Sequence, residues 1–97
     1  NKYYILDLQP ENSFVRHAVA QGHTVFMVSW RNMPLEMGSA TWDDYIEHGV
    51  LRAIEVARDI GGVEKINALG FCVGGTLLAC ALAVLRGRGE DPVASLT

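Results

Sequence analysis

The sequence is poor in charge and contains no long apolar run. Charged residues make up 20% of its 97 residues, and the formal net charge is −3 without a basic cluster. A surface of this kind offers no electrostatic match to nucleic acid or to an anionic membrane. The longest unbroken apolar run, Leu77 to Leu85, has nine residues, whereas a transmembrane helix needs ~20. We therefore expect neither nucleic-acid binding nor a transmembrane segment.

Cysteine is also scarce, with only Cys72 and Cys80, which lie eight positions apart. This spacing does not match a zinc site, and two cysteines do not make the disulfide framework of a small secreted domain. The sequence thus predicts no metal site and favours a reducing compartment. The hydrophobic content of 49% is that of a globular chain which buries a core.

Segments typical of strands and helices alternate along the chain. The predicted strands are Tyr3 to Leu6, Thr24 to Trp30 and a third that begins at Ile66, and the predicted helices are Pro10 to Gln21, Trp42 to Ile60 and Thr76 to Leu85. This alternation predicts an α/β fold with a parallel sheet and crossover helices. After the last helix, Val93 to Leu96 begin another apolar segment.

Local signals support these boundaries. Thr24 to Trp30 is β-rich and apolar without alternation, which is typical of a strand buried on both faces. Thr41, followed three residues later by Asp44, resembles an acidic capping box at a helix start. Gly22 suits the left-handed cap after the first helix, and Gly61 with Gly62 suits the end of the second.

The segment Gly70-Phe71-Cys72-Val73-Gly74 has the form of a nucleophile elbow, G-x-S-x-G, with cysteine in place of serine. It lies between a predicted strand and a predicted helix, as this motif requires. Gly70 and Gly74 are expected to leave room where a Cβ would collide with backbone, and Gly75 follows them directly.

Cys72 is the candidate nucleophile, because the start of a helix stabilises negative charge on a thiolate. The backbone N–H of Val73 can donate to a developing oxyanion. A second donor is expected between Asn1 and Pro10 or before this chain. The alternatives are that Cys72 is an inert, buried side chain, or that the glycines bind a phosphate, although the G-x-G-x-x-G spacing is absent. Cys80, inside the apolar helix, is predicted to be structural.

The other ionisable residues are better explained by structural roles. His17, His23 and His48 all precede the elbow, whereas hydrolases of this type supply their histidine after it. The acidic residues at the start of the second helix suit the helix dipole; they are Asp43, Asp44 and Glu47. Arg31 and Asn32 follow the central strand and are open to either a site or a packing role.

Four separated blocks resemble the poly(3-hydroxyalkanoate) synthases, in particular those of class I. The blocks are Asn1 to Leu8, Val28 to Asn32, Thr41 to Ile46 and Gly70 to Gly75. The resemblance implies an α/β-hydrolase fold in which Cys72 accepts the acyl group, with an Asp and a His beyond Thr97 completing a triad. Phe71 and Val73 beside the cysteine favour class I. One departure is Met33 before Pro34, where the family usually has proline directly after Asn32.

The same resemblance favours loop and early helix over strand for Tyr3 to Leu8, because the family has an apolar strand just upstream. It implies an acyltransferase that polymerises (R)-3-hydroxyacyl-coenzyme A, in class I the 3-hydroxybutyryl thioester, with release of coenzyme A and without a metal or organic cofactor. It also implies a homodimer on cytoplasmic polymer granules, with the growing polyester as a second ligand.

We expect residues 1–97 to be part of a single catalytic domain that is truncated at both ends. Without a base for Cys72, the chain alone is expected to be inactive and poorly soluble. The rival enzyme is a cysteine-variant esterase or thioesterase of the same fold, whose acyl-enzyme is released by water. The non-enzymatic alternative is a structural α/β module with an inert Cys72.

Overall fold

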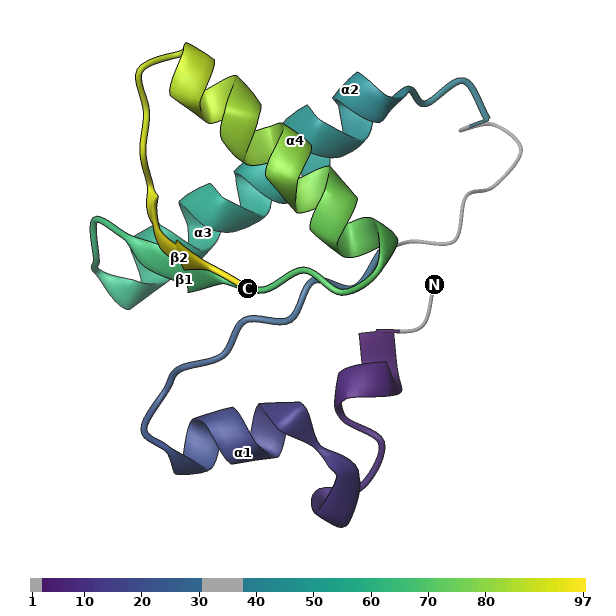
Figure 1. Ribbon diagram of the computed structural model, residues 1–97, viewed down its shortest axis with the longest axis vertical. Coiled ribbons are helices and arrows are strands. Elements are labelled where there is room, and N and C mark those ends of the chain that lie inside the picture. The colour runs from purple at the N-terminus through teal and green to yellow at the C-terminus, as the bar shows by residue number, and fades with distance from the viewer. Residues whose placement is uncertain (1–2, 31–37) are drawn as a thin grey trace. The chain divides into compact units, whose positions relative to one another are not determined.

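A computed structural model describes residues 3–30 and 38–97 (Figure 1). The chain divides into two compact units, Asn1–Gly38 and Ser39–Thr97. Each unit is described by itself below. Arg31, Asn32, Met33 and Pro34 lie outside the described residues, and so do the roles that the sequence suggests for them.

The first unit consists of short helices. Its elements are the 3-10 helices η1 (Tyr3–Leu6) and η2 (Pro10–Asn12) and the helix α1 (Phe14–Ala20). The predicted helix from Pro10 to Gln21 is therefore divided at Ser13, which has extended backbone angles and accepts a hydrogen bond from the Arg16 N–H at 2.9 Å. Gly22 follows α1 with a φ of 92°, as the predicted left-handed cap requires.

Two strand predictions fail in this unit. Tyr3 to Leu6 form η1, so the helical alternative suggested by the family resemblance is confirmed and the strand predicted from composition is wrong. Thr24 to Trp30 form no strand either. A buried strand needs hydrogen-bonding partners at its edges and cover on its faces. The described part of this unit contains no other strand, and Phe26, Met27 and Val28 are 37–45% exposed.

The second unit begins with a long helix in three parts. They are α2 (Trp42–Tyr45), a π-helical segment η4 (Ile46–Leu51) and α3 (Arg52–Gly61). The predicted capping box is confirmed: the Thr41 N–H donates to Asp44 Oδ2 at 2.9 Å, and the Asp44 N–H donates to Thr41 Oγ1 at 3.3 Å. Gly62 ends the helix with a φ of 64°.

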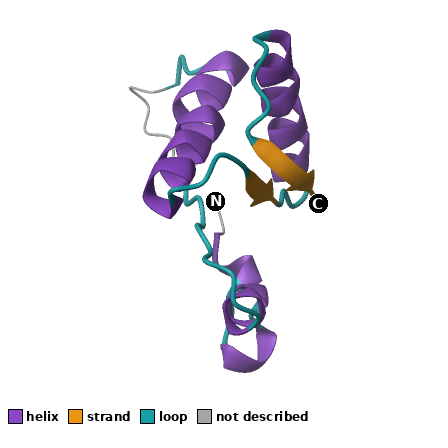
Figure 2. Ribbon diagram, turned by 90° about the vertical axis from the view of Figure 1, so that its left-hand side faces the viewer, coloured by secondary structure: helices purple, strands orange, loops and turns teal. Residues whose placement is uncertain are grey.

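A parallel pair of strands follows, connected by a helix. The strand β1 (Ile66–Ala68) leads through a turn to the helix α4 (Val73–Gly87), which leads to the strand β2 (Val93–Leu96). β1 and β2 pair in parallel, and Figure 2 shows them side by side in orange. This β-α-β connection confirms the predicted strand at Ile66 and the predicted apolar helix, which extends a few residues beyond both predicted ends.

The core of the second unit lies between the long helix and α4, which packs on the π-helical segment (Figure 1). Its buried apolar residues are Ile46, Ile54, Ala57, Leu77, Leu78, Ala81 and Leu85. Ala81 is fully buried at 0% exposure, so α4 and the long helix approach each other closely there. The inward face of the long helix includes Ile46, Ile54 and Ala57, all of which are buried.

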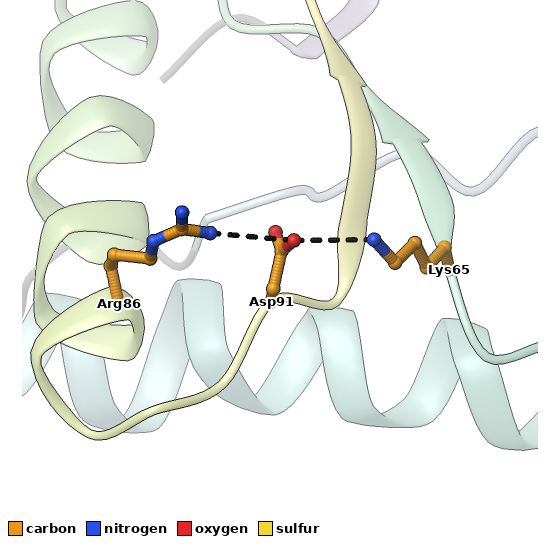
Figure 3. A network of polar contacts seen from close by, with 3 residues as sticks. All are labelled: Lys65, Arg86 and Asp91. Carbon is orange, nitrogen blue, oxygen red and sulfur yellow. Dashed lines mark hydrogen bonds and ion pairs between the residues drawn. The ribbon is translucent and has the colours of Figure 1, made fainter.

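Charged side chains hold the loop between α4 and β2. Asp91 accepts from Lys65 at 3.2 Å and pairs with Arg86 at 3.4 Å, so one carboxylate joins the start of β1 to the end of α4 (Figure 3). Arg88 pairs with Glu47 of the π-helical segment. All these side chains are about half exposed or more, and exposed pairs of this kind stabilise a fold only weakly. They direct the chain from α4 into β2.

Candidate nucleophile elbow

Cys72 occupies a strained turn between β1 and α4. Its backbone angles are φ 59° and ψ −126°, and it is the only non-glycine residue with positive φ in the described part of the chain. Such a conformation costs an L-residue about 1–3 kcal/mol and persists only where the surrounding structure enforces it. The elbow predicted from the sequence therefore forms with the strained geometry that presents a nucleophile.

The close backbone contact that enforces this turn joins Gly70 to Gly75. A Cβ added to Gly70 would lie 2.6 Å from Gly75 Cα and 2.8 Å from Gly74 O, and a Cβ added to Gly75 would lie 3.3 Å from Gly70 O. Because a Cβ does not fit at Gly70 and would be tight at Gly75, the end of the strand and the start of α4 meet through glycines.

Gly74 does not play the part that the sequence predicts for it. A Cβ built on Gly74 meets nothing within 4 Å among the described residues. The expected collision at Gly74 is thus wrong, because this residue lies on an open side of the first turn of α4 while its neighbour Gly75 faces the strand. The motif is better read as a pair of close-contact glycines at positions 70 and 75.

The backbone amides at the start of α4 differ in their partners. The Gly74 N–H donates to Phe71 O at 3.0 Å, and the Gly75 N–H donates to Cys72 O at 2.9 Å. For the Val73 N–H, no acceptor is found within the described ranges. The amide that the sequence singles out as an oxyanion donor is therefore open to an acceptor from outside this unit.

Cys72 itself is exposed, and its neighbours Phe71 and Val73 are 60% and 66% exposed. The exposure of Cys72 differs from the burial that the structural alternative expects. Cys80 lies eight residues along the helix, which is about 12 Å of rise, and it is partly buried. This position fits the packing role predicted for it.

The histidines and acidic residues of the earlier segments have structural settings. His17 lies in α1 and His48 in the π-helical segment, and both are exposed, as is His23. Asp44 completes the capping box, and Glu47 pairs with Arg88. The hydrogen bond from Arg88 lowers the pKa of Glu47 below its usual 4.5. The capping box supports the helix-start role predicted for Asp44, whereas the partner of Glu47 lies 41 positions away in the sequence.

Three residues that the sequence analysis overlooks hold the elbow strand in place. The Thr97 N–H donates to Ala68 O, and the Gly70 N–H donates to Thr97 O, both at 2.9 Å. The Ser95 hydroxyl donates to Asn67 Oδ1 at 2.8 Å. The pairing joins residues 28 positions apart, so no local pattern in the sequence could have revealed it.

Two hollows in the second unit are lined by residues toward the carboxyl end of α4. One, of about 240 Å³, is lined by Leu82, Arg86 and residues 90–96, and the other, of about 290 Å³, includes Arg58 and Arg88. Neither has Cys72 in its lining.

Over residues 3–30 and 38–97, no cluster of three or more metal-ligating side chains is present, and no helix of this part is long and apolar enough to cross a bilayer.

Comparison with known proteins agrees with this geometry. The family model described as the alpha/beta hydrolase fold matches residues 5–97. The chain belongs to the α/β-hydrolase fold family. In this fold a strand, a sharp turn and a helix present the nucleophile, and the family match confirms the fold class expected from the sequence.

Curated relatives within this fold family align with the entire chain. The poly(3-hydroxyalkanoate) polymerase subunit PhaC of Cupriavidus necator is 71% identical over 97 residues, which is 100% of this chain and 16% of that protein. The subunit PhaC of Rhizobium meliloti is 42% identical with the same coverage. Poly(3-hydroxyalkanoate) polymerase 1 of Ectopseudomonas oleovorans is 32% identical over 100 residues, 17% of its length. The chain thus spans about a sixth of the length of these relatives.

Proposed function

We propose that this chain is part of the catalytic domain of a poly(3-hydroxyalkanoate) polymerase and that Cys72 is its acyl-accepting nucleophile. One observation carries the assignment: among the described non-glycine residues, positive φ is confined to Cys72, at a strand-to-helix turn closed by Gly70 and Gly75. The names of the relatives that align with the whole chain supply the substrate class.

The proposed reaction is acyl transfer between thioesters. The Cys72 thiolate attacks the carbonyl carbon of a hydroxyacyl-coenzyme A, and a new sulfur–carbon bond forms while the carbonyl oxygen gains negative charge. The open Val73 N–H can donate to that oxygen. Collapse of the intermediate breaks the bond to the coenzyme A sulfur, and coenzyme A takes up the proton that Cys72 has lost.

Chain growth follows when a hydroxyl group attacks the acyl-Cys72 thioester. The new ester bond lengthens the polyester, the bond between the acyl carbon and the Cys72 sulfur breaks, and the proton of the hydroxyl returns to that sulfur. A thiol suits this step, because the acyl group remains activated as a thioester until the alcohol accepts it. The Asp and His that the resemblance implies beyond Thr97 would move these protons. No metal or organic cofactor enters this scheme.

The substrate range and cellular setting belong to the same proposal. Phe71 and Val73, which flank the nucleophile and are largely exposed, favour the class I preference for short acyl chains such as (R)-3-hydroxybutyryl. The full-length enzyme is proposed to be a homodimer at the surface of cytoplasmic polymer granules. The 97-residue chain alone is expected to release no more than one equivalent of coenzyme A per Cys72, because the base proposed for Cys72 lies beyond Thr97.

The test is a pair of cysteine variants in the full-length polymerase. Cys72→Ala should abolish polymer formation and leave the fold intact, whereas the matched control Cys80→Ala should keep its activity with at most a modest loss of stability. Substantial polymer from purified Cys72→Ala enzyme would overturn the assignment.

Product analysis separates the rival functions. Polymer of increasing length from hydroxyacyl-coenzyme A supports the polymerase, and free acid as the sole product supports a cysteine-variant esterase or thioesterase. A structural module with an inert Cys72 predicts that iodoacetamide fails to modify this residue in the folded protein, whereas an elbow thiol reacts readily.

A further inference from the structure

The strand next to the elbow strand carries a pairing irregularity at Ala94. Ile66 pairs with Val93, but the next residue, Asn67, pairs with Ser95, so Ala94 has no partner in β1. Bulges of this kind are rare in parallel pairs, and they redirect strands next to active sites. From Ser95 onward, the register of β2 against β1 therefore differs by one residue from the register at Val93.

A side-chain hydrogen bond follows the irregularity immediately. The Ser95 hydroxyl donates to Asn67 Oδ1 at 2.8 Å. Both residues are exposed in this unit, and Asn67 lies between the half-buried Ile66 and Ala68 on the other side of the strand. The bond links the first residue pair after the shifted position, where a one-residue slip would carry every later side chain to the opposite face.

The pairing of β2 with β1 beyond Ser95 determines the position of the elbow turn. Two residues beyond Ser95, the backbone of Thr97 accepts from the Gly70 N–H and donates to Ala68 O. Gly70 in turn has no spare room, because it lies against Gly75 at a distance that excludes a Cβ. A shift of β2 would therefore move Gly70 and disturb the turn that holds Cys72.

We propose that Ser95 and Asn67 form a register clamp that positions the Cys72 elbow. They act through β1 and touch no reacting atom, so they are positioning residues and not catalytic ones. β1 has only three residues and its ladder is interrupted, so few backbone bonds remain to set the register without this side-chain bond. Its effect on turnover rests on the proposed polymerase function, but its effect on the reactivity of the Cys72 thiol does not.

The test measures Cys72 reactivity and turnover in the full-length protein. Iodoacetamide modification of Cys72 is followed by peptide mass spectrometry without substrate, and kcat and KM are measured with hydroxybutyryl-coenzyme A. Ser95→Ala should slow modification and lower kcat by about threefold to tenfold, the effect of one lost hydrogen bond. KM and the melting temperature should change little.

Matched variants distinguish the loss of the bond between Ser95 and Asn67 from a general loss of stability. Ser95→Thr keeps the hydroxyl and should restore both rates, and Asn67→Asp keeps an acceptor and should remain close to wild type, unlike Asn67→Leu. Thr97→Ala removes a hydroxyl from the same segment but leaves the backbone bonds of Thr97, so it should behave as wild type.

Three outcomes would overturn the clamp: wild-type modification and kcat in Ser95→Ala, equal losses in Thr97→Ala, or no rescue by Ser95→Thr. If Ser95→Ala fails to fold, the contrast between Asn67→Asp and Asn67→Leu decides, and equal rates in those two variants would refute the clamp. Failure of the polymerase assignment would appear separately, as free acid without polymer from the wild-type protein, while the modification rates would still report on the clamp.

Discussion

The two units of this chain have sequence patterns of similar strength, but these patterns predict the structure of the second unit better than that of the first. In Ser39–Thr97, the capping box, the terminal glycine and the elbow all form where the sequence places them. In Asn1–Gly38, the apolar run from Thr24 to Trp30 has the composition of a central strand but forms none. The difference lies in the kind of signal. A cap or a turn is completed by residues a few positions away, whereas a strand requires a partner from elsewhere.

The largest expected contrast is in backbone hydrogen exchange of the 97-residue chain. Amides of α4 between Leu77 and Leu85 should exchange slowly, because they are hydrogen-bonded in the helix that carries four of the seven buried core residues. Amides from Thr24 to Ser29 should exchange near the rate of an unstructured peptide. Exchange measured by mass spectrometry tests both segments in one sample. Slow exchange from Thr24 to Ser29 would mean that this run has found a strand partner, and the contrast between the units would fail.

A second prediction concerns the close contact in the elbow of the second unit. Gly70→Ala places a Cβ within 2.6–2.8 Å of Gly75 and Gly74 backbone atoms, so it should destabilise the full-length protein by about 1–3 kcal/mol and remove most of the proposed polymerase activity. Gly74→Ala is the matched control. It enters open space in a helical turn, where alanine is favoured over glycine by about 1 kcal/mol. Urea denaturation and polymer assays measure both variants, and a control as damaging as Gly70→Ala would contradict the assigned contact.

Removing a helix cap should lower the stability by less than Gly70→Ala does, and by a similar amount in each unit. Thr41→Ala removes the acceptor for the Asp44 N–H, and Ser13→Ala removes the acceptor for the Arg16 N–H. Each should cost about 1 kcal/mol, the usual effect of a lost N-cap, although the two caps belong to different units. Helix content by circular dichroism and urea midpoints measure the loss. A cost confined to Thr41→Ala would show that local signals, too, are weaker in the first unit.

The smallest expected effect is the change with pH in the stability that the Glu47–Arg88 pair provides. The hydrogen bond from Arg88 lowers the pKa of Glu47 below 4.5, so the folded state binds this proton less tightly than the unfolded state does. The stabilisation is complete above pH 4.5 and is lost as the pH falls through the lower folded-state pKa. Glu47→Gln should therefore be slightly less stable than wild type at pH 7, and their urea midpoints should converge on acidification. A constant difference down to pH 3 would exclude this linkage.

Much of the second unit could be predicted because its signals are local. Thr41 and Asp44 cap a helix through atoms three residues apart, and the glycines around Cys72 identify the turn by their spacing. The prediction failed for Gly74 because the motif shows which residues are small and not which of them faces the strand. It failed for Thr24 to Trp30 because apolar, β-branched composition indicates a preference for a sheet and does not supply its neighbours.

The sequence by itself determined the order of the elements in the second unit, the ends of its long helix and the location of Cys72 at a strand-to-helix turn. Only the tertiary structure decided that Gly70 meets Gly75, that β2 pairs with β1 after skipping Ala94, and that Ser95 bonds Asn67. The physical reason is the distance over which each force acts along the chain. Caps and turns close within about four residues, but the bond between Asn67 and Ser95 joins residues 28 positions apart, and such a bond exists only after α4 has folded back and brought the second strand beside the first.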